Sequence, residues 1–209
     1  MKIVIFGATG AAGQELVLQA LKAGHEVTAV ARKPASVTAR HERLEVVEGD
    51  VTDAASMARA IAGQEAVALA VGPRPGTPPG TLISDATRAT LDGMKQHGVK
   101  RLALVSGLMA GEAKGANVFK RGLISIFRSM NRALCDDKRK ADAMVMASDL
   151  DWVIVRPPNF GEGTPRGTYR MGVDLDVSLS KMANRDVADG ILAAVTGDEH
   201  RRKVLEISN

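Results

Sequence analysis

Several residue types are scarce in this chain of 209 residues, and each scarcity argues against a class of protein. A single cysteine, Cys135, cannot form an internal disulfide and fits a reducing compartment. Aromatic residues make up only 3%, and the balance of 28 basic to 24 acidic residues is mild and spread out, so we expect no nucleic-acid partner. No apolar run approaches the about 20 residues that span a bilayer, and no basic-then-apolar leader precedes the first apolar segment. We therefore expect a cytoplasmic protein without a membrane partner.

Histidine is also rare, and the four histidines lie far apart, with no acid or cysteine at metal-ligand spacing: His25, His41, His97 and His200. We therefore expect no metal site.

What the chain does contain is a regular alternation of short apolar runs and amphipathic segments. We expect strands at 3–6, 27–30, 44–47, 66–71, 101–105, 152–155 and 204–207. Apolar residues at three- and four-residue spacing predict helices at 16–21, 54–62, 81–97, 128–147 and 186–196. This order predicts one α/β domain over residues 1–209, a doubly wound parallel sheet with helices on both faces.

Three glycines stand where the first predicted strand meets the first predicted helix: Gly7, Gly10 and Gly13. The first lets the chain turn sharply, the second leaves room for a pyrophosphate against bare backbone, and the third lets the helix approach the sheet. The first-turn amides would face the phosphates at the positive end of the helix dipole. Taken with the flanking strand and helix, this spacing predicts a dinucleotide site.

Two stretches interrupt the alternation, and both leave the edge of the sheet where ligands bind. Residues 72–80 are rich in proline and glycine, and residues 107–127 are rich in glycine, lysine and alanine. Each is either a surface loop or a lid over the cofactor, and their shared location favours a lid. The apolar residues of 107–127 could also form a helix packed on the core or on a partner subunit.

Four motifs together carry a resemblance to a known family: the glycine turn, Gly49-Asp50-Val51, Ser106 after the fifth strand, and the stretch from Asp151 to Pro158. With them the chain resembles the atypical short-chain dehydrogenase/reductases. Within these it is most similar to the NAD(P)H-binding, NmrA-like group that includes biliverdin reductase B, or flavin reductase. The resemblance implies a Rossmann-like domain and catalytic roles for Ser106 and Lys138. It implies NADP(H) contacts from Gly7, Thr9, Gly10, Ala11, Ala12, Gly13, Arg32, Lys33, Asp50, Val51, Val71, Gly72, Arg74, Ser106, Pro157, Pro158, Asn159 and Phe160.

The end of the second strand lacks the acid that binds the ribose hydroxyls in NAD-specific proteins. The chain has Ala31, Arg32 and Lys33 there instead. A guanidinium pairs with a 2′-phosphate, which an acid would repel, so we expect a preference for NADPH. The alternative is a pair of solvated surface charges. Asp50 either contacts the adenine or caps the helix that starts near Asp53.

The catalytic tyrosine of typical short-chain dehydrogenases is missing. Such enzymes carry it four residues before the lysine, but Leu134 stands four before Lys138. The one tyrosine, Tyr169, lies in a late stretch, and we interpret it as a packing residue. Hydride transfer to a flavin, quinone or tetrapyrrole needs no phenol, because the anion that forms is delocalised.

We therefore expect an NADPH-dependent reductase of a flat, conjugated small molecule, acting as a monomer or small homo-oligomer. The alternative is a non-enzymatic, redox-sensing regulator that binds NADP(H), as in NmrA-like proteins. An epimerase of nucleotide sugars fits less well, because such relatives keep the tyrosine.

Overall fold

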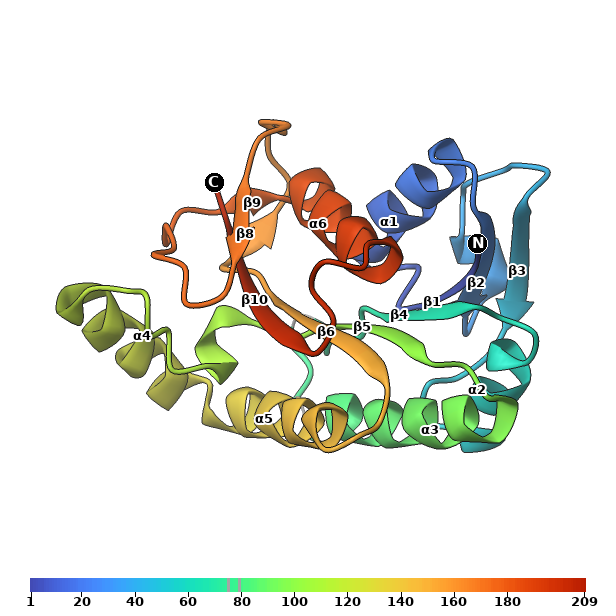
Figure 1. Ribbon diagram of the computed structural model, residues 1–209, viewed down its shortest axis with the longest axis horizontal. Coiled ribbons are helices and arrows are strands. Elements are labelled where there is room, and N and C mark those ends of the chain that lie inside the picture. The colour runs from blue at the N-terminus through green and yellow to red at the C-terminus, as the bar shows by residue number, and fades with distance from the viewer. Residues whose placement is uncertain (75, 79) are drawn as a thin grey trace.

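One central sheet organises the molecule, as seen in the computed structural model, which describes residues 1–74, 76–78 and 80–209 (Figure 1). Its strand order is β3-β2-β1-β4-β5-β6-β10-β8. The strands are β1 (Lys2–Phe6), β2 (Glu26–Ala31), β3 (Leu44–Glu48), β4 (Ala66–Leu69), β5 (Arg101–Val105), β6 (Asp151–Arg156), β8 (Arg170–Gly172) and β10 (Lys203–Ser208). All neighbours pair in parallel except β8, which is antiparallel to β10. The predicted α/β sheet is confirmed, with a short antiparallel strand added at one edge.

Helices cover both faces of this sheet, as predicted (Figure 1). One face carries α1 (Ala11–Lys22) and α6 (Asn184–Thr196), and the other carries α2 (Ala54–Ile61), α3 (Leu82–His97) and α5 (Arg132–Met146). In β1, Ile3 and Ile5 are buried in the core under α1 and α6, whereas Val4 and Phe6 are buried in the core on the opposite face. Because both faces are covered, the inner strands β1, β4 and β5 are nearly continuous apolar runs, whereas the edge strand β3 includes two glutamates.

The segment after β5 differs from the prediction. Residues 107–127 are not a continuous irregular excursion, because α4 (Val118–Met130) follows the short 3-10 helix η2 (Leu108–Ala110). The helical conformation is interrupted at Asn131, so α5 starts at Arg132 and not at residue 128. In Figure 1, α4 extends away from the body of the molecule at the end opposite β3.

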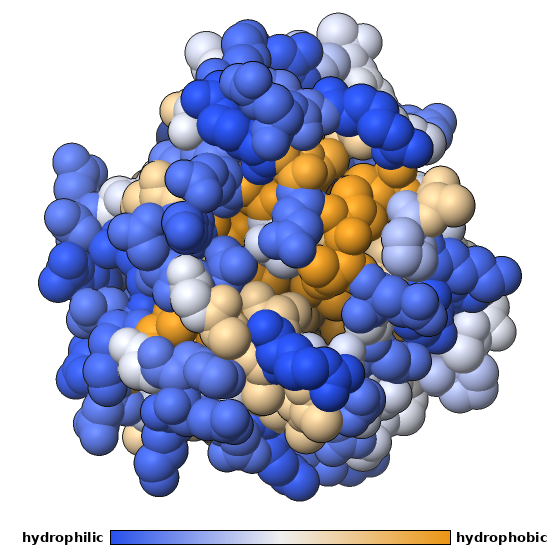
Figure 2. Space-filling view, turned by 90° about the vertical axis from the view of Figure 1, so that its right-hand side faces the viewer, coloured by the Kyte–Doolittle hydropathy of each residue, from blue (hydrophilic) through white to orange (hydrophobic). Residues whose placement is uncertain are grey.

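Smaller elements complete the fold. A two-stranded sheet pairs β7 (Phe160–Gly161) with β9 (Met182–Ala183), and the 3-10 helix η1 (Pro34–Ser36) follows β2. Figure 2 views the side on which β3 lies and shows apolar surface in a hollow ringed by hydrophilic residues. β3 is an edge strand, and exposed Glu45 and Glu48 discourage pairing with another chain. No helix among the described residues is long and apolar enough to cross a membrane.

Candidate functional site

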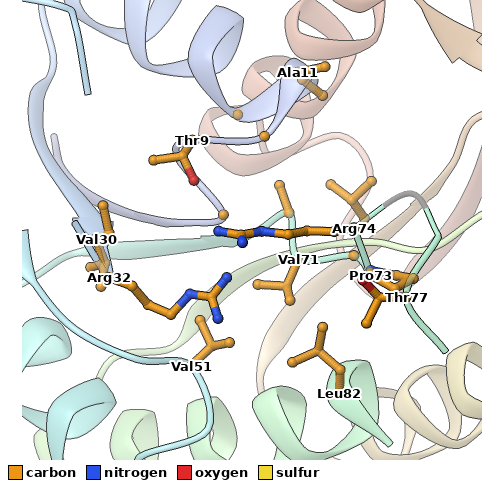
Figure 3. A pocket seen from close by; sticks show the side chains of 18 of the residues that line it. Thr9, Ala11, Val30, Arg32, Val51, Val71, Pro73, Arg74, Thr77 and Leu82 are labelled. Carbon is orange, nitrogen blue, oxygen red and sulfur yellow. The ribbon is translucent and has the colours of Figure 1, made fainter. Parts of the chain in front are cut away.

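A pocket of about 850 Å³ opens at the carboxyl ends of the central strands (Figure 3). It lies where the strand order reverses between β1 and β4, which is the place where open α/β sheets bind ligands. The pocket brings together most of the residues implied by the resemblance. These are Gly7, Thr9, Gly10, Ala11, Ala12, Gly13, Arg32, Asp50, Val51, Val71, Gly72, Arg74, Ser106, Lys138 and Phe160.

Four of the implied residues do not line this pocket: Lys33, Pro157, Pro158 and Asn159. Lys33 is exposed where η1 begins. The prolines are buried, and the carbonyls of this loop already accept hydrogen bonds. The Pro157 oxygen accepts from the Leu108 N–H at 2.9 Å, and the Asn159 oxygen from the Met182 N–H at 2.9 Å. These four positions lie outside the lining of this pocket, and their contact with the cofactor stays a prediction.

Other lining residues were not predicted as site residues. They are Val30, Ala31, Gly49, Thr52, Ala70, Pro73, Thr77, Pro78, Leu82 and Val105. Most of them neighbour a predicted site residue at the carboxyl end of a strand. A position at such a strand end would therefore have been enough to predict that these residues line the pocket. The stretch 72–80 contributes five lining residues among those described, whereas its Pro75 and Pro79 lie outside the described residues. Residues 107–127 contribute none, so the lid expected from that segment stays a prediction.

The three glycines of the turn have different structural reasons. Gly7 has a φ of +83°, and a Cβ there would lie 2.3 Å from the Ala70 carbonyl oxygen. A Cβ on Gly13 would lie 2.0 Å from the Gly7 carbonyl oxygen, so these two glycines are required for the backbone to pack. A Cβ on Gly10 would have only the Gly7 oxygen, at 3.2 Å, within contact distance. A side chain at Gly10 would therefore occupy the space of a ligand.

The first turn of α1 leaves its amides available. Gly10 is the N-cap residue, so no side chain caps the helix, and no acid lies in its first turn. Bare N–H groups at a helix N-terminus attract anions such as phosphates. The cradle thus fits a dinucleotide pyrophosphate.

Two guanidinium groups project into the pocket from opposite sides, Arg32 after β2 and Arg74 after β4 (Figure 3). Neither forms an ion pair with any described residue. Asp50 accepts hydrogen bonds from the Thr52 backbone N–H at 2.9 Å and the Thr52 hydroxyl at 2.8 Å. These bonds lower the pKa of Asp50, and the charge of Arg32 adds to the effect. The capping role belongs to Asp53, which accepts from Ala55 and Ser56, so Asp50 is not the helix cap.

The inner end of the pocket holds Ser106 and Lys138. The Lys138 ammonium donates to the Ser106 carbonyl oxygen at 2.6 Å, and burial lowers the pKa of this lysine. The Ser106 hydroxyl is buried and has no hydrogen-bond partner among the described residues. It lies close enough to the Asp142 carboxylate to help lower the pKa of that group, so Asp142 competes for this hydroxyl with any group that enters the pocket.

No phenol lines the pocket among the described residues. Leu134 is half-buried and packs against the core beneath the sheet. Tyr169 packs against the core on the other face, where its hydroxyl donates to Asp189 at 2.7 Å. Among its described residues the pocket therefore offers no tyrosine acid.

Buried carboxylates fix the helix that carries Lys138. Asp137 accepts from the backbone N–H groups of Ile83 and Ser84 at 2.8 and 3.1 Å and thereby ties α5 to the start of α3. Asp142, one turn after Lys138, pairs with Arg156 at 2.7 Å. Burial raises the pKa of Asp142, and the positive charge of Arg156 opposes this shift. The lysine is thus held from two neighbouring elements.

Comparison with known proteins agrees with this site. A family model described as NAD(P)H-binding matches residues 7–198. A (4-alkanoyl-5-oxo-2,5-dihydrofuran-3-yl)methyl phosphate reductase of Streptomyces griseus is 30% identical over 213 residues, covering 99% of this chain and 67% of the relative. Reductases are therefore among the relatives of this chain.

Solved structures show the same fold at lower identity. A short-chain dehydrogenase/reductase from Veillonella parvula, solved in complex with NADP, has a TM-score of 0.79 and 18% identity over 100% of this chain and 94% of that one. ChuY, an anaerobillin reductase from Escherichia coli O157:H7, has a TM-score of 0.80 and 21% identity over 100% of this chain and 97% of that one. At these identities the two structures show a shared fold alone. The family match includes the glycine turn, the strand ends around the pocket and Lys138, and this chain belongs to the NAD(P)H-binding family.

Proposed function

We propose that this protein is an NADPH-dependent reductase that transfers hydride to a flat, conjugated small molecule such as a flavin, a quinone or a tetrapyrrole. One observation carries the proposal. The pocket has a bare phosphate cradle, two arginines without ion pairs and an inner end with Ser106 and Lys138, but no phenol among its described residues.

The chain's own residues would bind and orient the cofactor along the pocket. The amides from Ala11 to Gly13 would hold the pyrophosphate, and Arg32 would pair with the 2′-phosphate. When bound, NADPH supplies the hydride. Ser106 and Lys138 lie at the inner end, where their hydroxyl and ammonium would position the nicotinamide half.

The missing phenol determines the class of acceptor. Reduction of an aliphatic ketone forms an alkoxide, which needs a proton donor because its pKa is very high. Reduction of a flavin or quinone forms a delocalised anion that solvent can protonate, so positioning can supply much of the rate and no phenol is essential. We extend this proposal to the NmrA-like subgroup and to a cytoplasmic location, both of which rest on the sequence.

The test is NADPH oxidation, followed by its absorbance, with a flavin, a quinone and a dye as separate acceptors. We expect turnover with at least one of them and slower turnover with NADH. If NADPH binds tightly and none of the acceptors is reduced, the protein is better described as an NADP(H)-binding regulator, and the reductase proposal is wrong.

A further inference from the structure

Helix α4 exposes an unusual amount of apolar surface. It holds five of the nine large apolar side chains that are exposed in the described residues: Val118, Phe119, Ile126, Phe127 and Met130. Val118 is 85% exposed, Phe119 75% and Met130 74%, whereas Ile124 alone in this helix is buried. A surface helix normally turns its apolar side inward, so this one needs an explanation.

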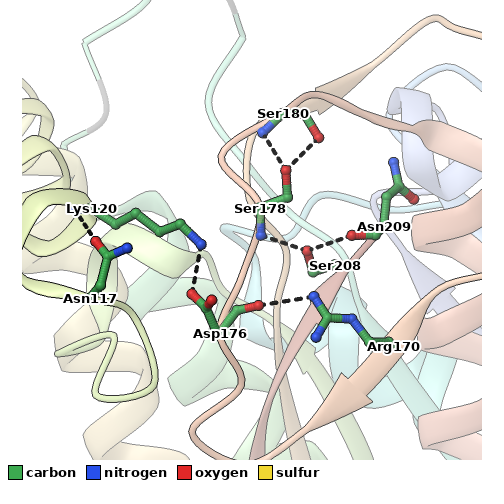
Figure 4. A network of polar contacts seen from close by, with 8 residues as sticks. All are labelled: Asn117, Lys120, Arg170, Asp176, Ser178, Ser180, Ser208 and Asn209. Atoms are coloured by element: carbon green, nitrogen blue, oxygen red, sulfur yellow. Dashed lines mark hydrogen bonds and ion pairs between the residues drawn. The ribbon is translucent and has the colours of Figure 1, made fainter.

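The inner side of α4 is firmly held, so the helix cannot turn its apolar side inward. Ile124 is buried with Leu108 and Val177. The Lys120 ammonium pairs with Asp176 at 2.7 Å, and Asn117 caps the first turn through the Lys120 N–H (Figure 4). The Arg128 guanidinium donates to the carbonyl oxygens of Met109 and Gly111. These contacts fix which side of the helix faces the protein.

The outward side forms a continuous row, which we call the α4 stripe: Phe119, Leu123, Ile126 and Met130, flanked by Phe127. The spacing of four, three and four residues is the one by which two helices pack along a shared seam. The stripe carries no charge. Two copies brought together there would meet no like charges.

The exposed area is close to what a dimer interface requires. With about 200 Å² for a fully exposed aromatic side chain, the exposed fractions give α4 roughly 600 Å² of apolar surface. A standard interface buries about 800 Å² per partner, and side chains flanking the stripe would supply the remainder.

We propose that the α4 stripe packs against the α4 stripe of a second copy of this chain, forming a two-fold dimer. In an antiparallel pair, Phe119 of one copy lies toward Met130 of the other, with Leu123 and Ile126 near the two-fold axis. Closed two-fold dimers are the commonest soluble oligomers, and one self-complementary patch is sufficient to build them.

The charges of α4 favour this occupant over an anionic lipid surface. A membrane-binding helix needs free cations beside its apolar side. Of the three cations of α4, Lys120 is paired with Asp176 and Arg128 is occupied by backbone carbonyls of the segment after Ser106. Arg121 alone is exposed without an ion pair among the described residues, which is fewer free cations than a basic membrane-binding helix carries. Helix α4 is followed directly by α5, which carries Lys138. The dimer interface would thus lie one helix away from the inner end of the pocket.

The experiment is to measure the solution mass of the full chain by light scattering across a range of concentrations. We expect twice the 22.0 kDa of one chain. Ile126→Glu should raise the dissociation constant of the dimer at least about a hundredfold, because symmetry places the new charge in the interface twice. The matched control is Leu18→Glu, which alters an exposed apolar residue on α1 (52% exposed) and should leave the mass unchanged.

NADPH binding by both variants shows that they are folded. A variant that binds NADPH but no longer dimerises tests the dimer proposal independently of the reductase proposal. A monomeric wild-type protein at all concentrations would overturn the proposal. So would a folded Ile126→Glu variant that still dimerises, or wild-type monomers that bind only to anionic vesicles.

Discussion

The ammonium of Lys138 lies 2.6 Å from the carbonyl oxygen of Ser106, so α5 is fastened to the carboxyl end of β5 inside the pocket. Asp137 and Asp142 hold the same helix from either side of the lysine, through the start of α3 and through Arg156. A lysine that has lost its tyrosine partner is thus kept in a fixed place at the inner end of the pocket, which supports a role in binding.

Replacing Lys138 with Met should weaken NADPH binding without loss of stability. A lost charge-assisted hydrogen bond corresponds to about 1.5–3 kcal/mol, or roughly tenfold or more in the dissociation constant. Burial lowers the pKa of Lys138, so below that pKa its charge opposes folding, and this cost is lost gradually as pH rises from the lowered pKa to the ordinary lysine value. At neutral pH the uncharged Met avoids this cost but removes the donor to the Ser106 carbonyl oxygen, and these opposing effects should leave the melting temperature nearly unchanged. NADPH titration and thermal unfolding check this, and a large drop in melting temperature with unchanged binding would contradict it.

Replacing Arg32 with Ala should weaken NADPH far more than NADH. The guanidinium projects into the pocket and forms no ion pair among the described residues, so it is available to the 2′-phosphate. A charge-assisted pair contributes about 1.5–3 kcal/mol, more than about tenfold in affinity.

Lys33→Ala is the matched control for Arg32→Ala, since Lys33 is the next residue but does not line the pocket. It should change the two affinities little and equally. If Arg32→Ala weakens NADPH and NADH to the same degree, Arg32 does not determine cofactor preference.

Gly10→Val should abolish dinucleotide binding in a folded protein. Gly10 has an extended φ of −74°, and a Cβ there would meet only the Gly7 oxygen, so the valine methyls would occupy phosphate space. Gly13→Ala should instead prevent normal folding, because its Cβ would lie 2.0 Å from the Gly7 oxygen. Circular dichroism and NADPH titration separate the two outcomes. A Gly10→Val variant with unchanged NADPH affinity would show that the glycine turn is only structural.

The sequence predicted the sheet well and the segment after β5 poorly, for a physical reason. A strand such as β1 is buried on both faces, so its apolar run directly reflects its surroundings. In α4 most apolar residues face outward, so the usual link between apolar spacing and the core does not hold. The three-residue β8 is too short to show a period, and Asn131 breaks a helical pattern that otherwise continues from 128.

For the site, strand ends were predictable, but side-chain direction was not. Arg32 and Lys33 are adjacent and both basic, but of these two residues only Arg32 lines the pocket. Pro157 to Asn159 follow β6 as predicted, but hydrogen bonds of their carbonyls to Leu108 and Met182 became visible only in three dimensions.

Asp137→Ala should lower the stability of the whole domain. The buried Asp137 carboxylate accepts hydrogen bonds from two backbone N–H groups at the start of α3, 54 and 53 positions earlier in the chain. No other side chain among the described residues caps that helix. Removing a charged acceptor from buried donors costs about 2–3 kcal/mol, which lowers the melting temperature by roughly 5–10 °C in a chain of this size. The neighbouring Asp136→Ala serves as control, because its ion pairs with Arg132 and Arg139 are long and largely exposed. Equal melting temperatures for the two variants would refute the capping role.

Leu134 stands where a catalytic tyrosine would be and packs, half-buried, against the core. Simple aliphatic ketones and secondary alcohols should be poor substrates, because no phenol lines the described part of the pocket to exchange a proton with an alkoxide. Flavins and quinones should be reduced. Ser106→Ala should lower kcat with these acceptors only modestly, by about 1 kcal/mol or roughly fivefold, since its hydroxyl contributes one hydrogen bond and no essential acid. Steady-state rates with each acceptor class provide the measurement, and rapid oxidation of a secondary alcohol by the wild-type protein would show that the pocket contains a proton donor that this account lacks.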